Sequence, residues 1–511
     1  MLAQLTSAAL QGVESYLVRV EVNLGRGLPS FAVVGLAEGA VREGRERVWA
    51  AIQNSGFSLP PKKITVNLAP ADIRKEGSAF DLPLALGLLA GAGRVSPKGF
   101  RLRAFVGELG LDGTLRPIRG ALSVAEACKT GGLNSLVLPV GNAPEAAVVG
   151  GLEVLGARNL QEVVEHLEGV RKLPSTPLNG HGLEAPGGKE HPDLSDVRGQ
   201  GYVKRALEVA AAGGHNLLLI GPPGSGKTML ARRLPGILPA LSLQEALETT
   251  RVHSVAGLLP PGESLIRRRP FRAPHHTVSD AGMVGGGRIP RPGEVSLAHN
   301  GVLFLDELPE YRRNVLEALR QPLEDGEVFL ARARVSLRFP SRFVLVGAMN
   351  PCPCGYFGDG THRCTCDPGM ILRYRGKVSG PLLDRVDLHV TVGRVPLQEL
   401  GKEGGETESP KVRRRVQEAR RRQVERLREA GGGYCNGQMG PGEIRRFCRP
   451  GTEVARFLQR ALEGLHLSAR AYHRILKVSR TLADLEGGGE IQASHVAEAV
   501  QYRALDRKDP L

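Results

Sequence analysis

Aromatic residues are scarce in this chain. Phe, Trp and Tyr make up 4% of its 511 residues, with one tryptophan among them. Proteins that grip single-stranded nucleic acid without sequence preference commonly stack the bases on aromatic side chains, and this composition does not support such a platform. Any contact with nucleic acid is therefore expected at the phosphate backbone.

Cysteine is also infrequent, and long apolar runs are missing. Seven cysteines in a chain of this size do not make a disulfide scaffold. No apolar run approaches the roughly 18–20 residues that span a bilayer. The N-terminus shows neither the basic segment nor the apolar core of a signal peptide. These features predict a cytoplasmic protein in a reducing compartment, with no membrane partner.

Acidic residues are outnumbered by basic ones. The chain has 68 Lys and Arg against 53 Asp and Glu, and its formal net charge is +15. This excess favours a polyanionic partner, of which nucleic acid is the commonest, although a basic housekeeping enzyme would have the same charge. The length exceeds what one hydrophobic core supports and predicts about three domains.

A glycine-rich loop lies between a predicted strand and a predicted helix. The apolar run 217–220 leads into the pattern GxxxxGK[ST], and helix-compatible residues follow. Glycines let backbone N–H groups approach phosphate oxygens, and the positive end of the helix supports that cradle. The lysine is expected to reach the outer phosphates and the threonine to ligate Mg²⁺. The predicted nucleoside triphosphate site is Gly221, Pro222, Pro223, Gly224, Ser225, Gly226, Lys227 and Thr228.

Two further apolar runs end in polar residues suited to this chemistry. The run 301–305 reads as a strand of a parallel sheet and ends in Asp306 and Glu307. Asp306 is predicted to hold Mg²⁺, while Glu307 orients or deprotonates the attacking water. A second run, 342–349, ends in Asn350, which can contact the γ-phosphate or that water. The carboxylate pair therefore predicts hydrolysis as well as binding.

Arg385 follows a turn and precedes another predicted strand. This position suits an arginine finger presented to the phosphates of a neighbouring subunit, a role worth about 10³–10⁵ in turnover. A salt-bridged surface arginine is the alternative interpretation.

The first 170 residues alternate strand-like and helical runs, which predicts a mixed α/β domain. Residues 73–81, 106–113 and 116–118 resemble the peptidase domain of Lon-type proteases. That family uses a catalytic serine and a downstream lysine. Ser78 lies near the serine position, but Lys129 comes about one turn too late, so the fold is expected without an intact Ser-Lys pair.

The other predicted parts follow in order. Residues 171–192 are rich in Pro, Gly and polar groups and read as a linker. An ATPase core with a parallel sheet is expected over 193–397. A charged helix and a helical lid domain are expected over 398–511. The arginine runs 413–415 and 420–422 read as a solvated helix face, with DNA contact as the less favoured alternative.

The motifs together resemble an AAA+ ATPase of the magnesium-chelatase and MCM-helicase branch. The stretches 271–276 (FRAPHH), 292–299 (PGEVSLAH) and 350–355 (NPCPCG), together with the Lon-like N-terminal domain, narrow the resemblance to the ComM/YifB family. Such a resemblance implies a ring-forming, hexameric ATPase that uses ATP and Mg²⁺ and promotes branch migration of DNA during recombination in natural transformation. It also assigns Arg470 as a second sensor arginine in the lid. A magnesium-chelatase-type motor subunit that remodels a partner protein is the alternative, and an ATP-dependent protease is the third.

Residues 328–337 are predicted to form a β-hairpin whose centre contains Arg332 and Arg334. Related helicases carry a hairpin here whose basic tip enters the central channel. Arg332 and Arg334 are therefore predicted to contact DNA phosphates, independently of sequence and sensitively to salt.

Four cysteines are close together in the sequence. They form two CxC pairs around a nine-residue loop and are Cys352, Cys354, Cys364 and Cys366. Four thiolates can close a tetrahedral Zn²⁺ site, although CxC is tighter than the usual CxxC. Reduced structural thiols or a redox-sensitive pair are the alternatives.

Overall fold

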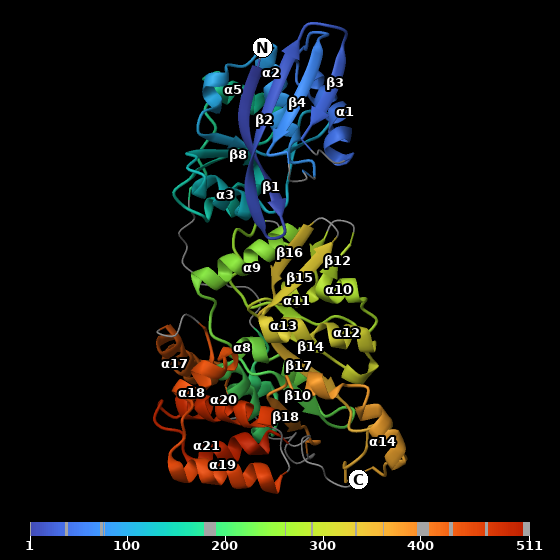
Figure 1. Ribbon diagram of the computed structural model, residues 1–511, viewed down its shortest axis with the longest axis vertical. Helices are drawn as coiled ribbons and strands as arrows, with labels where there is room; N and C mark the ends of the chain where they lie inside the picture. Colours follow the sequence, from blue (N-terminus) through green and yellow to red (C-terminus); the bar gives the residue numbers. More distant parts are fainter. Residues whose placement is uncertain are drawn as a thin grey trace. The chain divides into compact units, whose positions relative to one another are not determined.

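A computed structural model describes most of the chain (Figure 1). The described residues are 2–35, 39–71, 75, 77–177, 191–260, 262–287, 290–332, 335–360, 362–395, 408–428, 433–465 and 469–503. The chain divides into two compact units. Unit 1 contains residues 1–184, 243–266 and 331–339, and unit 2 contains 185–242, 267–330 and 340–511.

Unit 1 is built on a seven-stranded mixed sheet with the order β3-β4-β2-β1-β5-β8-β9. The long strands β1 and β2 pair antiparallel, whereas β5, β8 and β9 continue the sheet in parallel. The alternation of residues 18–24 sends every second side chain into the core, as expected for a strand with one buried face. The strands are β1 (Leu2–Gln11), β2 (Glu14–Gly25), β3 (Ser30–Val34), β4 (Lys63–Ala69), β5 (Arg103–Phe105), β8 (Ser135–Pro139) and β9 (Glu153–Ala157), with the small pair β6 (Glu108–Leu109) and β7 (Leu115–Arg116) beside them.

Helix α2 (Asp81–Gly91) is the central helix of unit 1, and all eleven of its residues are buried. Its sequence is apolar all round, which is typical of a helix enclosed by other elements. Asp81, at its start, pairs with Arg47 at 2.9 Å. Burial raises the pKa of Asp81, and the Arg47 partner opposes that rise. The other helices are α1 (Gly39–Asn54), α3 (Ala121–Thr130), α4 (Ala143–Ala147) and α5 (Leu160–Leu167).

Helix α9 (Leu243–Ala256) comes from the middle of the chain but packs within unit 1. Ser254 accepts a hydrogen bond from the backbone N–H of Gly120 at 2.9 Å and donates one to the buried Glu145. Arg251 pairs with Glu126 on α3 at 3.3 Å. Unit 1 therefore contains chain from well beyond residue 170, and the predicted domain limits 1–170, 171–192, 193–397 and 398–511 stay predictions.

Unit 2 is built on a five-stranded parallel sheet with the order β11-β14-β17-β10-β18. The strands β10 and β17 are completely buried, which is why both read as unbroken apolar runs. Among the described strands, β17 lies between β10 and β14. The strands are β10 (Leu217–Ile220), β11 (Phe271–Arg272), β14 (Val302–Leu305), β17 (Val344–Met349) and β18 (Leu388–Thr391).

Helices surround this sheet, and the last ones form the C-terminal part of unit 2 (Figure 1). The helices α6 (Gly201–Gly213), α7 (Lys227–Ala231) and α8 (Leu234–Ile237) flank β10 in sequence. Shorter elements follow along the chain: α10 (Asp280–Val284), β12 (Gly285–Gly286), β13 (Arg291–Pro292), α11 (Glu294–Leu297), α12 (Arg313–Ala318), α13 (Arg320–Asp325), β15 (Glu327–Arg332), β16 (Val335–Pro340), α14 (Pro368–Arg375) and α15 (Gly380–Leu383). Of these, β16 belongs to unit 1 except for its last residue. The last helices are α17 (Ser409–Arg428), α18 (Pro441–Phe447), α19 (Thr452–Gly464), α20 (Ala469–Leu485) and α21 (Ala493–Gln501). The mixed α/β fold with a parallel P-loop sheet and C-terminal helices is confirmed.

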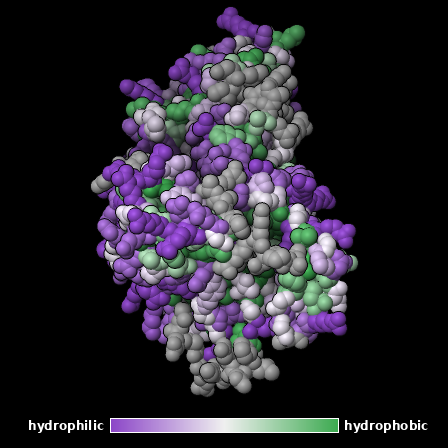
Figure 2. Space-filling view, turned by 60° about the horizontal axis from the view of Figure 1, so that its bottom comes forward, coloured by the Kyte–Doolittle hydropathy of each residue, from purple (hydrophilic) through white to green (hydrophobic). Residues whose placement is uncertain are grey.

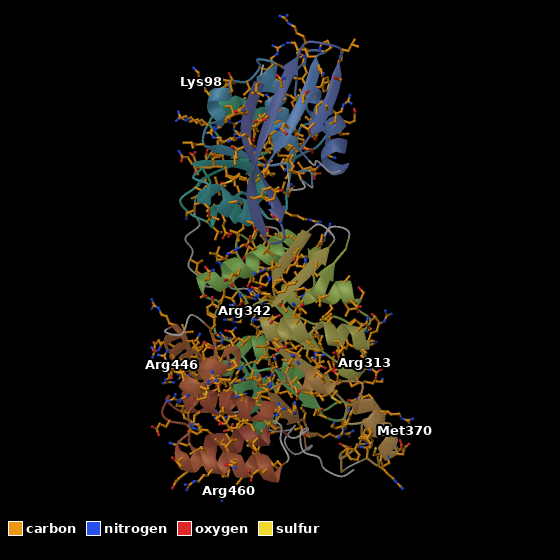
Figure 3. The ribbon with its side chains drawn as sticks, viewed as in Figure 1. Lys98, Arg313, Arg342, Met370, Arg446 and Arg460 are labelled. Carbon is orange, nitrogen blue, oxygen red and sulfur yellow. The ribbon has the colours of Figure 1, made fainter. Side chains whose placement is uncertain are left out.

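The surface and interior differ in composition as expected. On the face drawn in Figure 2, hydrophilic residues predominate and hydrophobic ones are scattered. Basic side chains such as Arg446 on α18 and Arg460 on α19 point outward (Figure 3). No helix among the described residues is long and apolar enough to cross a membrane.

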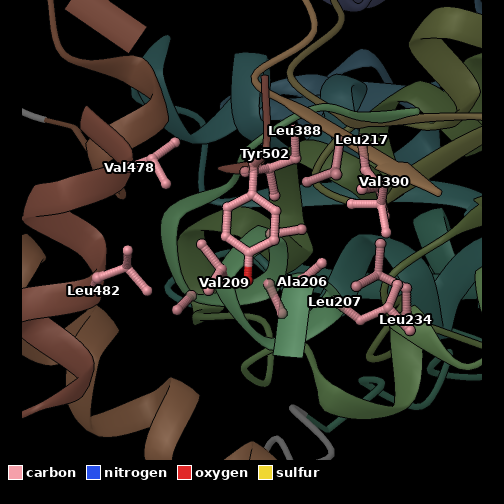
Figure 4. Packing of buried hydrophobic residues seen from close by; sticks show 14 of the residues in the cluster. Ala206, Leu207, Val209, Leu217, Leu234, Leu388, Val390, Val478, Leu482 and Tyr502 are labelled. Atoms are coloured by element: carbon pink, nitrogen blue, oxygen red, sulfur yellow. The ribbon is translucent and has the colours of Figure 1, made fainter. Parts of the chain in front are cut away.

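The core of unit 2 joins the sheet to the C-terminal helices (Figure 4). Tyr502 is completely buried among residues of α6, the sheet and α20, including Val209, Leu388 and Val478. Its hydroxyl donates to Glu498 at 2.9 Å, so the polar end of the ring is satisfied. The nucleotide-type sheet and the C-terminal helices therefore share one hydrophobic core.

The burial of α2 generates a stability prediction. Leu86→Ala should destabilise unit 1 by about 2–5 kcal/mol, because it removes a fully buried side chain and leaves a cavity. Trp49, the single tryptophan, packs against the same core, so its fluorescence reports unit 1 during urea unfolding. The urea midpoint should fall clearly. Leu28→Ala is the matched control, since Leu28 is 87% exposed, and an equal shift in both variants would contradict the prediction.

Candidate nucleotide site and four-cysteine cluster

The glycine-rich loop connects β10 to α7 in unit 2. Gly224 and Gly226 have φ values of +76° and +87°, a left-handed conformation that favours glycine. Gly221 is required for a different reason, because a Cβ there would lie 2.2 Å from the carbonyl oxygen of Val392. Packing against the end of β18 therefore demands the first glycine, whereas backbone conformation demands the other two.

The predicted phosphate and Mg²⁺ residues meet at the carboxyl ends of three neighbouring strands. Lys227 Nζ donates to Asn350 Oδ1 at 3.2 Å, which connects the end of β10 with the end of β17. Thr228 Oγ1 donates to Asp306 Oδ2 at 2.7 Å, which connects α7 with the end of β14. Clefts at the carboxyl ends of parallel strands are where such sheets bind ligands. Residues separated by more than 120 positions thus form one cluster.

The Lys227 ammonium lies over the loop. It donates to the carbonyl oxygens of Gly221 and Pro222 at 2.7 and 3.0 Å, in addition to Asn350. Burial lowers the pKa of Lys227, and the nearby Asp306 carboxylate opposes that change. A bound triphosphate would offer this half-buried cation stronger, charged acceptors. The loop therefore fits a nucleotide, with Thr228 and Asp306 supplying oxygens of the type that Mg²⁺ prefers.

Glu307 follows Asp306 and points away from the sheet. Its φ is +51°, and its backbone N–H donates to Asp306 Oδ1 at 3.0 Å. The side chain is 63% exposed, and its carboxylate lies 3.6 Å from Nδ1 of His276. The Glu307 carboxylate is therefore accessible to solvent beside Asp306.

His276 is the residue that our role assignments from sequence missed. It follows β11, which pairs with β14, so the sheet brings it beside Glu307. Its ring packs on His275 at 4.1 Å and edge-on against Tyr311 at 6.4 Å. The Tyr311 hydroxyl donates to the carbonyl oxygen of Pro274 at 2.6 Å, which holds this loop in place. The sequence stretch 271–276 (FRAPHH) contains His276 and indicated the family, but it did not predict the contact between His276 and Glu307.

A pocket of about 530 Å³ opens beside these residues. Lys377 pairs with Glu310 at 3.3 Å along its wall. Burial, followed by the charge of Glu310, raises the pKa of Tyr374 to about 12, so the phenol stays protonated at neutral pH. Met370 marks the α14 side of this region in Figure 3. The lining residues are Glu307, Glu310, Asn350, Pro353, Met370, Arg373, Tyr374 and Lys377.

Arg385 lies away from the loop of its own chain. Its guanidinium pairs with Glu324 on α13 and donates to the carbonyl oxygen of Pro381 at 2.7 Å. It lines a second depression of about 580 Å³, together with residues of α12, α13 and β15. Within the described part of the chain, its hydrogen bonds do not reach the P-loop.

Arg470 lies at the start of α20, but its side chain is outside the described residues. Four positions later, Arg474 pairs with the buried Asp387, which precedes β18. Burial alone would raise the pKa of Asp387, but Arg474 and His215 hold it well below its usual range. This ion pair connects α20 to the sheet.

The basic helix α17 uses several arginines to bind its own unit. Arg415 pairs with Glu208 at 2.6 Å, and Arg420 donates to the carbonyl oxygen of Ala211 at 2.7 Å. Arg426 pairs with the buried Asp484. The predicted solvated face is therefore only part of the picture: Arg415 is exposed but paired, and Arg421, also exposed, pairs with Glu425 at 3.9 Å.

Two other predicted sites are only partly described. The strands β15 and β16 form a two-stranded sheet, and Arg332 ends β15. The side chain of Arg332 and the whole of Arg334 lie outside the described residues. In unit 1, Ser78 donates to Glu108, whereas Lys129 donates to the carbonyl oxygen of Val149 at 3.2 Å. Ser78 and Lys129 thus bind different partners.

The four cysteines form one cluster in unit 2. All four sulfur atoms lie within 4.8 Å of one another. Cys354 lies 3.3 Å from Cys352 and 3.5 Å from Cys364, and the Cys352–Cys364 distance is 3.7 Å. These separations are far longer than a disulfide bond of about 2.05 Å, so the cluster consists of free thiols.

Comparisons with known proteins agree with this geometry. The family model described as magnesium chelatase subunit ChlI matches residues 193–400, and related models for ChlI and its C-terminal part match 20–142 and 406–503. The chain is 47% identical to the competence protein ComM of Haemophilus influenzae, over 99% of this chain and 98% of that protein. It is also 47% identical to the uncharacterized protein YifB of Escherichia coli, over 98% and 97%.

The chain belongs to the ComM/YifB family of magnesium-chelatase-like AAA+ proteins. Its similarity to the magnesium-chelatase 38 kDa subunit of Rhodobacter capsulatus is more limited. That match has 30% identity and covers 33% of this chain and 53% of that protein. Membership of the ComM/YifB family implies the use of ATP and Mg²⁺ and suggests ATPase activity.

Proposed function

We propose that this protein is an ATP-hydrolysing, ring-forming motor that acts on DNA. The observation that carries the proposal is the pair of hydrogen bonds from Lys227 to Asn350 and from Thr228 to Asp306. These bonds gather a P-loop lysine, a Mg²⁺-type hydroxyl and carboxylate, and a polar strand-end residue at one point. This set of groups is the one that phosphoryl transfer from a nucleotide requires.

The proposed roles follow from these positions. The backbone of 221–226 and Lys227 bind the phosphates of ATP, while Thr228 and Asp306 hold Mg²⁺, which neutralises charge on the β- and γ-phosphates. Glu307 takes a proton from the attacking water or orients it, and His276 limits the positions of the Glu307 side chain. Asn350 contacts the γ-phosphate or that water, and Arg470 approaches the γ-phosphate from the lid. The proposed cofactors are ATP and Mg²⁺ at this site, with Zn²⁺ at the four cysteines.

Arg385 is proposed to act on a neighbouring subunit. It lies beside a depression on unit 2 and makes its hydrogen bonds with Glu324 and Pro381. A guanidinium held near the surface by one carboxylate can change partners when a phosphate is presented to it. This role requires a homo-oligomer, and we propose a hexameric ring.

DNA is the proposed partner because the chain has a positive net charge and because one of its relatives is named a competence protein. The net charge is +15, and ComM, at 47% identity over nearly the whole chain, is named a competence protein. We propose branch migration during recombination in natural transformation, with Arg332 and Arg334 contacting phosphates. A cytoplasmic location suits this role. The second candidate is a chelatase-type activity that remodels a partner protein. The observation in its favour is the similarity to the Rhodobacter capsulatus subunit, which covers 33% of this chain.

Replacing the Glu307 carboxylate should greatly slow ATP hydrolysis without abolishing ATP binding. Glu307→Gln is expected to bind ATP as well as the parent protein, but to hydrolyse it about 100-fold or more slowly, because the amide cannot accept the proton. Lys227→Ala should lose ATP binding itself. Binding of a fluorescent ATP analogue and phosphate release measure the two effects. The exposed Glu418→Gln serves as the control, and full turnover by Glu307→Gln would exclude its role.

Arg385 should be required by the adjacent subunit. Arg385→Ala is expected to lose at least about 10³-fold in turnover, since the finger supplies charge only to the transition state. Mixing it with Lys227→Ala should restore partial activity, because some interfaces then pair an intact Lys227 with an intact Arg385. Arg414→Ala, an exposed change on α17, should behave as wild type. An absence of recovery at every mixing ratio, with mixed oligomers demonstrated, would contradict shared sites.

DNA should stimulate hydrolysis, and salt should weaken the effect. Backbone contacts release counterions, so the DNA concentration needed for half-maximal stimulation should rise steeply with salt. The double variant Arg332→Ala/Arg334→Ala should keep the DNA-free rate but lose most of the stimulation. Phosphate release is measured with single-stranded, duplex and branched DNA. Equal rates with and without every DNA would rule out the motor and favour the chelatase-type alternative.

A further inference from the structure

We propose that the four cysteines bind one Zn²⁺ ion and that this ion positions Asn350 in the nucleotide site. The predicted effect of the zinc ion on ATP hydrolysis rests on the proposed function. The zinc site itself rests on the positions of the four sulfur atoms, which do not depend on that function. The proposal assigns a task to a cluster that none of the proposed catalytic steps uses.

The sulfur positions fit a single tetrahedral ion. Four thiolates around Zn²⁺ at about 2.3 Å lie about 3.8 Å from one another. The separations among Cys352, Cys354 and Cys364 are 3.3, 3.5 and 3.7 Å, and all four sulfur atoms lie within 4.8 Å of one another. An all-sulfur tetrahedral set selects zinc among the common divalent ions. The spacing leaves room for one ion.

The surrounding backbone supports thiolates. The N–H of Cys354 donates to the sulfur of Cys366, and the N–H of Phe357 donates to the sulfur of Cys352, both at 3.4 Å. Such donors orient metal-bound ligands and stabilise their negative charge. The tight CxC spacing is therefore accommodated by the loop backbone.

The cluster is connected to the nucleotide site along the chain. Asn350 comes directly after β17, and Cys352 follows two residues later. The Asn350 side chain accepts a hydrogen bond from Lys227, and Asn350 and Tyr374 line the same pocket. Tyr374 lies on α14, whose first residue, Pro368, comes two positions after Cys366. The four cysteines thus lie between Asn350 and α14 in the sequence.

The loop also contacts the P-loop directly. Gly355 has φ +86°, and a Cβ there would lie 2.6 Å from Cδ of Pro223. Arg375, also on α14, donates to the carbonyl oxygen of Pro351 at 3.1 Å and lies over the ring of Phe357. An ion that fixes this loop would fix Asn350 and one side of the P-loop together. Its loss should impair hydrolysis more than ATP binding, because the other phosphate ligands remain.

The test uses the full-length protein. Elemental analysis after expression in zinc-replete medium should find about one zinc per chain. Cys364→Ser/Cys366→Ser should lose the zinc, whereas Cys128→Ser, a thiol of unit 1, should keep it. The turnover of the double variant should fall about 10–100-fold, with the affinity for a fluorescent ATP analogue changed less than about threefold. Circular dichroism checks that the variant folds.

Hydrogen–deuterium exchange gives a measurement that does not need ATPase activity. Removal of zinc from wild-type protein with a chelator should speed exchange in the peptide that contains Asn350, and adding zinc back should reverse it. Less than about one tenth of a zinc per chain, iron in its place, or disulfides among the four cysteines would overturn the metal site. Unchanged exchange and turnover after complete zinc loss would overturn the link to Asn350. If zinc and exchange behave as expected but the wild-type protein hydrolyses no ATP, the proposed function fails and the metal proposal stands.

Discussion

The structure depends most on the parallel alignment of β10, β17 and β14. Because parallel strands end at the same edge of a sheet, the residues after them converge without needing to be near in sequence. Lys227 and Asn350 connect the first two strands, and Thr228 and Asp306 connect the first with the third. The three strands are buried and apolar, so hydrophobic packing stabilises their side-by-side order. The site residues that follow the strands are polar. The residues of the candidate nucleotide site in unit 2 lie at that edge.

Elements outside the sheet restrain each of these polar ends. The His275–His276 loop approaches Glu307, and Tyr311 anchors that loop. Lys227 donates to the side chain of Asn350, while the end of β18 packs on Gly221. Charged groups that must act on phosphates are costly to hold in place, since each loses hydration and rotamer freedom. Distributing the restraints over several loops keeps the acceptors and donors oriented while Glu307 remains accessible.

The two units share the sequence in an interleaved way. Helix α9 and residues 331–339 belong to unit 1, although the P-loop precedes them and Asn350 follows them. The contacts of Ser254 with Gly120 and Glu145 join this inserted helix to the N-terminal segment. In unit 2 the ion pair of Arg474 with Asp387 joins the C-terminal helices to the sheet. Connections of this kind are the physical means by which changes at a nucleotide site can reach other parts of a chain.

The sequence by itself determined the P-loop, the apolar strands and the polar residues at their ends, because these depend on local patterns of hydrophobicity and on fixed spacings. It also identified the four cysteines as a candidate metal set. The tertiary structure decided which strand lies between β10 and β14, and therefore that Asn350, between the two, contacts Lys227. It showed His276 beside Glu307, α9 within unit 1, and arginines of α17 bound to their own unit. Those contacts join residues far apart in sequence, and only the packing of whole elements brings them together.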